Sequence, residues 1–220
     1  HAAVLRSPHA HATIVSINTD AARKARGVIA VLTAAEVARD GLNGLRPTAE
    51  ANVKTGEPFA FMPQPLLAEG KVRYVGEPVA FVIAATQNQA LDAAELIEVA
   101  YAPLAAVVYA EAAMQPGAPQ VAEGVAGNLC FDWQFGDADG VAAAMKSAAH
   151  VVTTSLDNHR VVTNPMEPRG GVGMFDPSSA RFTLHASTQN VHGIRDFTAR
   201  ALGVDAAKVR FIAPDVGGNF

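Results

Sequence analysis

Three short polar segments near the end of the chain carry the residues best placed to bind a ligand. They are NPMEPRGG at residues 164–171, STQN at residues 187–190 and DVGGNF at residues 215–220. Each lies beside a predicted strand end, where side chains and main-chain amides converge on ligands in α/β folds. Gly217 and Gly218 indicate a tight turn or a loop that contacts a ligand, because glycine lets other groups approach the main chain closely.

Each of these segments also has a purely structural interpretation. Glu167 lies between two prolines and is expected to fix a turn. Residues 187–190 are typical of the N-terminal cap of a helix. By itself, Gln189 therefore gives little reason to expect a catalytic role.

The histidines and the cysteine do not predict a protein-ligated metal. His9 and His11 would share one face of a strand, but no third ligand is evident. The single Cys130 excludes an internal disulfide, and it excludes an iron-sulfur cluster held by this chain's own thiolates. The histidines that lack the spacing of a zinc site are His159, His185 and His192. No GxSxG elbow, Walker loop or GxGxxG fingerprint is present.

The composition narrows the class of protein. Half of the 220 residues are hydrophobic and 17% are charged, as in an ordinary globular protein. The net charge is −4, so the chain has no overall positive potential that would attract phosphate groups, and nucleic acid is not an expected partner. No apolar run is long enough to span a bilayer and the start lacks a signal core, so we expect a cytoplasmic location. Both termini are expected to be internal to a longer sequence.

The elements that position these segments follow an α+β rhythm. In the first part, strands are predicted at residues 11–19, 28–33 and 99–108, with a strand, turn and strand over 71–86. Helices are predicted at 20–27, 34–41 and 87–99, the last with Leu91, Ala94 and Leu96 at helical spacing. Residues 42–65 lack a sustained period, which indicates a long surface loop.

A stretch rich in glycine and proline predicts a domain boundary. Residues 114–127 form the expected linker between a domain at 1–113 and another at 128–220. In the second, strands are predicted at 128–137, 150–162, 180–187 and 208–214, with a helix at 138–149. A helix over 188–204 has Ile194, Phe197, Ala201 and Leu202 on one face and ends at Gly203.

Several motifs in order resemble one known family. The runs NHRVVTNPMEPRGG, HASTQNVHGIRDFTARALGV and KVRFIAPDVGGNF are similar to the molybdenum-binding large subunit of the xanthine oxidase family. The nearest resemblance is to its bacterial members of the carbon monoxide dehydrogenase and aldehyde dehydrogenase types. HAAVLRSPHAHATI, VIAVLTAAEV and VRYVGEPVAFVIAAT resemble that family's α/β hammerhead domain. The resemblance implies a hammerhead domain followed by the start of a molybdopterin-binding α/β domain.

The resemblance also implies roles for individual residues. Gln189 would reach toward the molybdenum and hydrogen-bond an oxo ligand or the pterin, as a neutral amide donor can. Gly217 and Gly218 would wrap around the cofactor, with Asn219 and Phe220 beside them. Asn219 stands where many relatives have another glycine, and Glu167 belongs to a motif that looks structural.

In this family the reaction hydroxylates a carbon centre with oxygen from water, and electrons leave through iron-sulfur clusters to a flavin. The implied cofactor is molybdopterin cytosine dinucleotide, held by the pterin's sulfurs. The implied partners are an iron-sulfur subunit, an FAD subunit and the remainder of the molybdenum subunit, which would carry the glutamate base beyond residue 220. Aldehydes, carbon monoxide, purines and N-heterocycles are all possible substrates, and we favour an aldehyde or an aromatic heterocycle. The alternative is a non-catalytic assembly module that retains the hammerhead domain.

Overall fold

A computed structural model of the chain describes residues 1–46, 56, 58–60, 64–133, 135–159, 161, 164 and 166–217. Most of the long loop predicted at 42–65 therefore lies outside the described residues. Its described ends meet, because Leu45 and Gln64 form an isolated antiparallel bridge. The described helices include none that is long and apolar enough to cross a membrane.

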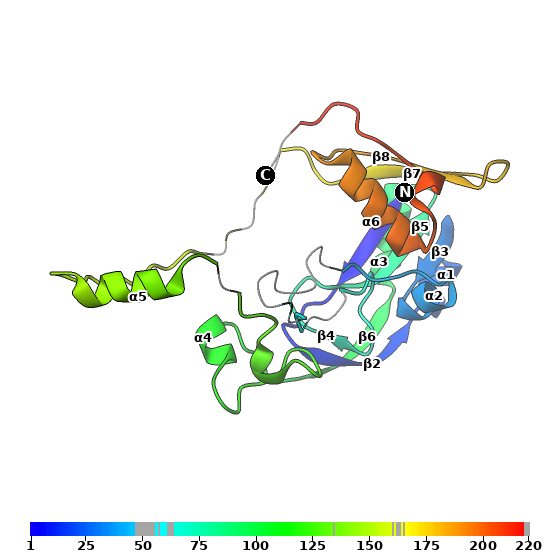
Figure 1. The fold of residues 1–220 in the computed structure, drawn as a ribbon. Helices are drawn as coiled ribbons and strands as arrows, with labels where there is room; N and C mark the ends of the chain where they lie inside the picture. Colours follow the sequence, from blue (N-terminus) through cyan, green and yellow to red (C-terminus); the bar gives the residue numbers. More distant parts are fainter. Residues whose placement is uncertain are drawn as a thin grey trace.

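The first part of the chain forms two antiparallel three-stranded sheets (Figure 1). One has the strand order β1-β5-β3 and the other β4-β2-β6. The strands are β1 (Ala2–Arg6), β2 (Ala12–Asn18), β3 (Val28–Leu32), β4 (Lys71–Val72), β5 (Pro78–Ala84) and β6 (Glu98–Pro103). Their alternating β-branched residues suit a pleated sheet with one buried face.

Three helices accompany these sheets: α1 (Asp20–Lys24), α2 (Ala34–Arg39) and α3 (Gln87–Glu95). Short polar residues begin two of them. Thr33 and Glu36 form a reciprocal capping box at α2, and the Thr86 hydroxyl accepts from the Gln89 amide at α3. These local signals help to explain why α2 and α3 were predictable from the sequence.

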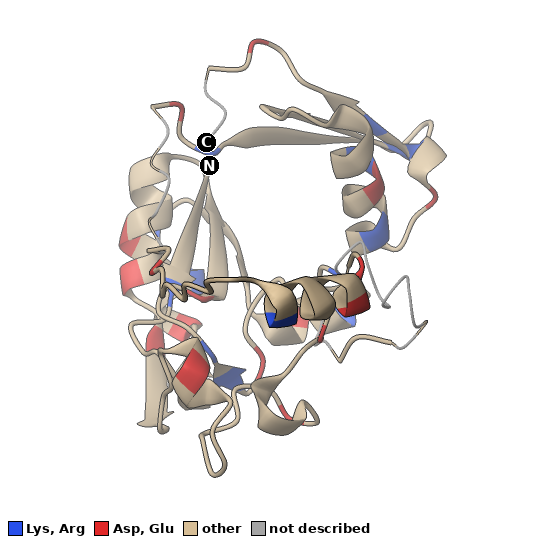
Figure 2. Ribbon diagram, turned by 60° about the vertical axis from the view of Figure 1, so that its left-hand side comes forward, with Lys and Arg blue, Asp and Glu red and all other residues tan. Residues whose placement is uncertain are grey.

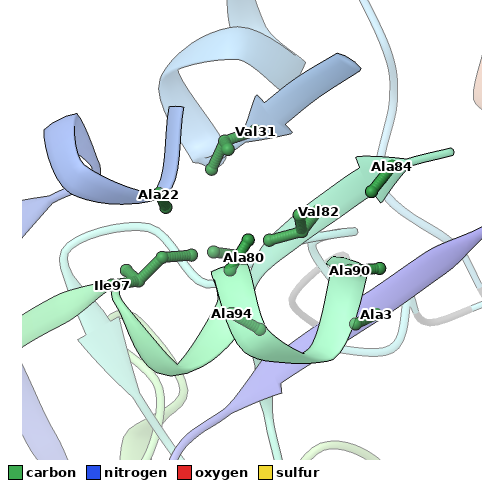
Figure 3. Packing of buried hydrophobic residues seen from close by; sticks show 10 residues of the cluster. Ala3, Ala22, Val31, Ala80, Val82, Ala84, Ala90, Ala94 and Ile97 are labelled. Atoms are coloured by element: carbon green, nitrogen blue, oxygen red, sulfur yellow. The ribbon is translucent and has the colours of Figure 1, made fainter. Parts of the chain in front are cut away.

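Small apolar side chains let α3 pack closely on the β1-β5-β3 sheet (Figure 3). The fully buried valines Val31 and Val82 lie among alanines from both layers. The alanines in this core are Ala3, Ala22, Ala80, Ala84, Ala90, Ala93 and Ala94. The sequence pattern correctly predicts the helix and the burial of Ala94, but Leu91 and Leu96 are exposed. Ala90 and Ala93 face the sheet instead, since a leucine there would hold the two layers apart.

The stretch between the two predicted domains is flanked by helix α4 (Ala110–Ala113) and includes a 3₁₀ turn, η1 (Ala126–Asn128). Asn128 organises this stretch: its side-chain oxygen accepts from the Val121 amide, and its NH₂ group donates to the carbonyls of Ala113 and Pro119. The linker predicted at 114–127 is thus held by side-chain hydrogen bonds. The domain boundary that we place there stays a prediction.

The third sheet has the order β7-β8-β9 and carries the candidate site. Its strands are β7 (Gly171–Asp176), β8 (Arg181–Ala186) and β9 (Val209–Ile212). Helix α6 (Val191–Leu202) and the 3₁₀ turn η2 (Ala206–Lys208) connect β8 to β9. Helix α5 (Ala138–Ser147) lies apart from all three sheets (Figure 1).

Two strand predictions in this part are wrong. The described residues of 128–137 and 150–162 contain no strand. Their side chains do alternate, but Phe131 and Trp133 are exposed and neither segment pairs with another. Alternation alone does not make a strand, because a strand is stable only when its backbone groups bond to a neighbour.

Helix α6 agrees with the sequence prediction in its apolar face and in its end before Gly203, but it begins at Val191 and not at residue 188. The Asn190 side chain accepts from the Gly193 amide at its start, and Gly203 ends it in the left-handed conformation at φ 66°. Ile194, Phe197 and Ala201 line one side of a groove of about 480 Å³, opposite Leu45 of the first part. These residues therefore share a face, as their spacing predicts.

Candidate functional site

The described residues of the three polar segments meet at one edge of the β7-β8-β9 sheet. Strands β8 and β9 are parallel, with His185 beside Ile212, so the residues after each strand emerge at the same edge. Strand β7 runs antiparallel to β8, with Gly171 beside Ala186, so it begins at that edge. In open α/β sheets, ligands bind at the carboxyl ends of parallel strands.

The residues around Gln189 are held by their own side chains. The Thr188 hydroxyl accepts from the Asn190 amide at 3.1 Å, and the Asn190 side chain accepts from the Gly193 amide at 2.8 Å. Gln189 is exposed and directly precedes the capped N-terminus of α6. The prediction of a helix cap at 187–190 is confirmed, and the cap places Gln189 where the helix presents its N-terminal amides.

Glu167 joins this segment to the glycine loop. One carboxylate oxygen accepts a hydrogen bond from the Ser187 hydroxyl, and the other accepts from the Gly217 amide. The Ser187 bond first, and then the Gly217 bond, hold the pKa of Glu167 below its usual range, because both stabilise the ionised form. At neutral pH the side chain is a charged acceptor with two donors.

The structure therefore brings together a set that sequence reasoning only partly identified. Gln189 and Gly217 were predicted members, and both lie at the edge of the sheet. Gly218, Asn219 and Phe220 lie outside the described residues. Glu167 was assigned to a turn and Ser187 to a cap, because no local signal relates residues that are 20 positions apart.

The histidine pair has other partners. The His9 ring packs against Tyr101 with centroids 4.8 Å apart, and His11 Nδ1 lies 2.7 Å from the carbonyl oxygen of Ala105. Across the described part of the chain, no group of three His, Cys, Asp or Glu side chains is arranged to hold a metal ion. Acidic and basic residues are interspersed over the helices and loops (Figure 2).

Comparison with known proteins identifies both parts of the chain. Residues 1–105 match the a/b hammerhead domain of aldehyde oxidase and xanthine dehydrogenase, and residues 121–220 match the molybdopterin cofactor-binding domain. The carbon monoxide dehydrogenase large chain of Afipia carboxidovorans is 36% identical over 98% of this chain and 27% of its own length. The nicotine 6-hydroxylase large subunit of Paenarthrobacter nicotinovorans is 36% identical over 100% of this chain and 26% of its own.

The fold agrees with these matches. Quinoline 2-oxidoreductase from Pseudomonas putida 86 superposes with a TM-score of 0.86 at 35% identity, covering 100% of this chain and 27% of that one. The chain thus spans about a quarter of the length of these relatives. Its two matched regions lie in the order hammerhead, then cofactor-binding domain. The chain belongs to the xanthine oxidase family of molybdenum enzymes, in which it represents the N-terminal portion of the large, molybdopterin-binding subunit.

Proposed function

We propose that the chain forms one wall of the molybdenum cofactor pocket of an oxidoreductase that hydroxylates an aldehyde or an aromatic heterocycle. The oxygen would come from water. The observation that carries the proposal is the convergence of the STQN segment and Gly217 at the carboxyl edge of β8 and β9, where Glu167 bonds to both. This is the edge at which α/β sheets bind ligands, and it lies in the region that matches the molybdopterin cofactor-binding domain.

The donor set at this edge fits such a cofactor. It consists of the Gln189 amide and the main-chain amides of α6 that precede Gly193, whose own amide bonds to the Asn190 side chain, with no cysteine nearby in the sequence. Neutral donors suit the oxygen atoms of an anionic group, and helix N-terminal amides favour negative charge. A metal held by a pterin instead of by protein ligands also agrees with the absence of a His, Cys, Asp or Glu cluster among the described residues.

The residues at this edge of the sheet have distinct roles in this proposal. The cofactor, when bound, supplies the two-electron oxidation. Gln189 would donate a hydrogen bond that orients the cofactor, and the hydrogen bonds of its neighbours Thr188 and Asn190 hold the segment around it in place. The predicted loop residues Gly217, Gly218, Asn219 and Phe220 would contact the cofactor, and Phe220 would give the pocket an apolar wall against a planar substrate.

The substrate class rests on the names of the relatives. Two of them are named for nicotine and quinoline, which are aromatic N-heterocycles, and another is named an aldehyde oxidoreductase. We therefore retain an aldehyde or an aromatic heterocycle as the substrate. Relatives named for carbon monoxide are equally similar, so the assay must include that gas.

The partners follow from the same comparison. Relatives are named as a large chain, a large subunit and a subunit of a complex, which supports an assembly of several chains. We propose an iron-sulfur subunit, an FAD subunit and the remainder of the molybdenum subunit as partners. The cofactor would be molybdopterin cytosine dinucleotide. A cytoplasmic location stays a prediction from the sequence.

The test is to purify the protein from its native host with all associated chains, and to measure molybdenum, iron and flavin. About one molybdenum per copy is expected, together with turnover of aldehydes or N-heterocycles. An assembly that lacks molybdenum would contradict the proposal. It would favour the alternative of a non-catalytic assembly module, which the enzyme names of the relatives do not support.

A further inference from the structure

The Glu167 carboxylate lies where three segments of the β7-β8-β9 sheet meet. Glu167 precedes β7, Ser187 follows β8, and Gly217 lies in the loop after β9. Each carboxylate oxygen accepts from one of these neighbours, the Ser187 hydroxyl or the Gly217 amide. A single side chain thus links the ends of all three strands.

Gly217 has the close approach that this contact requires. A Cβ atom at Gly217 would lie 2.9 Å from Glu167 Oε2 and 3.3 Å from Glu167 Cβ, so any larger residue would push the carboxylate away. The amide of Gly217 therefore points at a side chain of the same protein. Any main-chain donors that the loop offers to a ligand would be other amides.

Comparison with Asp176 shows how the contacts of Glu167 differ from those of a carboxylate that only fixes a turn. Asp176 also has a pKa below its usual range, because the hydroxyls of Ser179 and Ser178 donate to it. Its partners lie two and three residues away, within the hairpin turn at the other end of β7. The partners of Glu167 lie 20 and 50 residues away. Asp176 shapes a local turn, whereas Glu167 joins two segments that local sequence does not hold together.

We propose that Glu167 is a positioning residue that holds Gly217, in the loop after β9, against the STQN segment before the cofactor binds. The proposal rests on the function proposed above. It adds a role for Glu167, which the sequence motif alone suggested to be structural. By holding the Ser187 hydroxyl, Glu167 also fixes the segment that presents Gln189. Glu167 is only partly buried and lies outside the hydrophobic core, so this link depends on its two hydrogen bonds.

Hydrogen exchange in the cofactor-free enzyme directly tests the link from Glu167 to Gly217 and Ser187. The complete subunit is purified with its partners from a host that cannot make the cofactor, and amide exchange is followed by mass spectrometry. In the wild-type protein, one slow amide is expected in the peptide that covers residues 213–220. In Glu167→Ala this amide is expected to exchange about tenfold faster, because a hydrogen bond to a charged acceptor is lost.

Three further variants make the result specific. Glu167→Gln should behave nearly as wild type, because the glutamine oxygen can accept from Gly217 while its NH₂ group donates to the Ser187 oxygen. Ser187→Ala removes one of the two bonds and should have the smaller effect. Asp176→Asn is the matched control at the opposite end of β7, and it should leave residues 213–220 unchanged.

Unchanged exchange at residues 213–220 in Glu167→Ala would overturn the proposal. Equal acceleration throughout β7 and β8 would also overturn it, because the residue would then support the sheet and not the loop. Molybdenum retained per chain, measured after expression in a cofactor-making host, should fall in Glu167→Ala and recover in Glu167→Gln. A wild-type enzyme that never holds molybdenum would contradict the proposed function, while the exchange result would still decide the role of Glu167.

Discussion

Asn43 of the first part caps the end of helix α6 in the second part. Its amide donates to the carbonyl of Ala201 at 2.8 Å, and its side chain donates to the carbonyl of Arg200 at 3.0 Å. The last carbonyls of a helix have no partner within the helix, so they accept readily from outside. The hammerhead part thus holds the C-terminal end of the helix whose N-terminal end carries Gln189.

Replacing Asn43 with alanine should loosen this contact. The side-chain bond to Arg200 is lost while the main-chain bond to Ala201 stays, so we expect a loss of about 1 kcal/mol at the contact. Faster hydrogen exchange of the amides at 203–204 would report it. Asn18→Ala is the control, because Asn18 bonds to Glu98 within the first part. Equal exchange in the two variants would mean that the contact does not stabilise the end of α6.

Replacing Gln189 with alanine should slow turnover strongly while the protein stays folded. The loss of one oriented donor at a reacting group lowers turnover by about a hundredfold in other enzymes. Steady-state kinetics of the complete enzyme, normalised to molybdenum content, measure the effect. Gln115→Ala is the control, because Gln115 lies far from Gln189 in the sequence and donates a hydrogen bond to the carbonyl of its near neighbour Glu111. Unchanged turnover at full molybdenum loading would remove Gln189 from the mechanism.

Gly203→Ala should destabilise the end of α6 by about 1 kcal/mol, because its φ of 66° lies in the left-handed region. The added Cβ meets the Asn43 side chain only at 3.6 Å, so the cost comes from the backbone and not from a clash. Chemical denaturation of the chain measures it. Gly173→Ala in β7 is the matched control, since a Cβ there meets nothing within 4 Å. A cost as large at Gly173 would contradict this explanation.

Val31→Ala should cost roughly 2 kcal/mol of unfolding free energy, because the side chain is fully buried and a cavity would remain. Ile29→Ala in the same strand should change it by less than about 0.5 kcal/mol. Ile29 is 72% exposed because the pairing of β3 with β5 shifts between Val28 and Ala30 and leaves it outside the ladder. Urea unfolding of both variants tests the comparison, and equal losses would contradict the assigned register.

Glu36 should make the stability of the first part depend on pH. Burial raises its pKa, but hydrogen bonds from Thr33 and the charge of Arg23 outweigh this and lower the pKa to about 2. Its ordinary value is 4.5. The folded pKa is the lower one, so the stabilisation is complete above pH 4.5 and is lost as the pH falls toward about 2.

Urea unfolding of wild type and Glu36→Gln measures this dependence. The wild type should exceed the variant in stability near neutral pH, and the difference should shrink at about pH 3. Glu95→Gln, at the exposed end of α3, is the control. If the difference in stability between wild type and Glu36→Gln stays constant over this pH range, then ionisation of Glu36 does not stabilise the folded state.

Local signals in the sequence determined the elements that need few distant contacts. Helix α6 has its cap at Asn190, its apolar spacing and its terminal Gly203 within one short segment, so its existence, its apolar face and its approximate position could be predicted. The α+β fold class came from the same kind of pattern, whereas the family was recognised from the resemblance of several motifs in order. Prediction failed at 128–137 and 150–162, because a strand requires a partner and the alternation of side chains does not supply one.

The site divides in the same way. The sequence indicated Gln189 and the glycine loop, since their residue types and their places after strands are local properties. Only the tertiary structure joined Glu167 to Ser187 and Gly217. The reason is that strand order and direction decide which loop ends meet. Parallel pairing of β8 with β9 and antiparallel pairing of β7 with β8 bring three separate segments to one edge of the sheet.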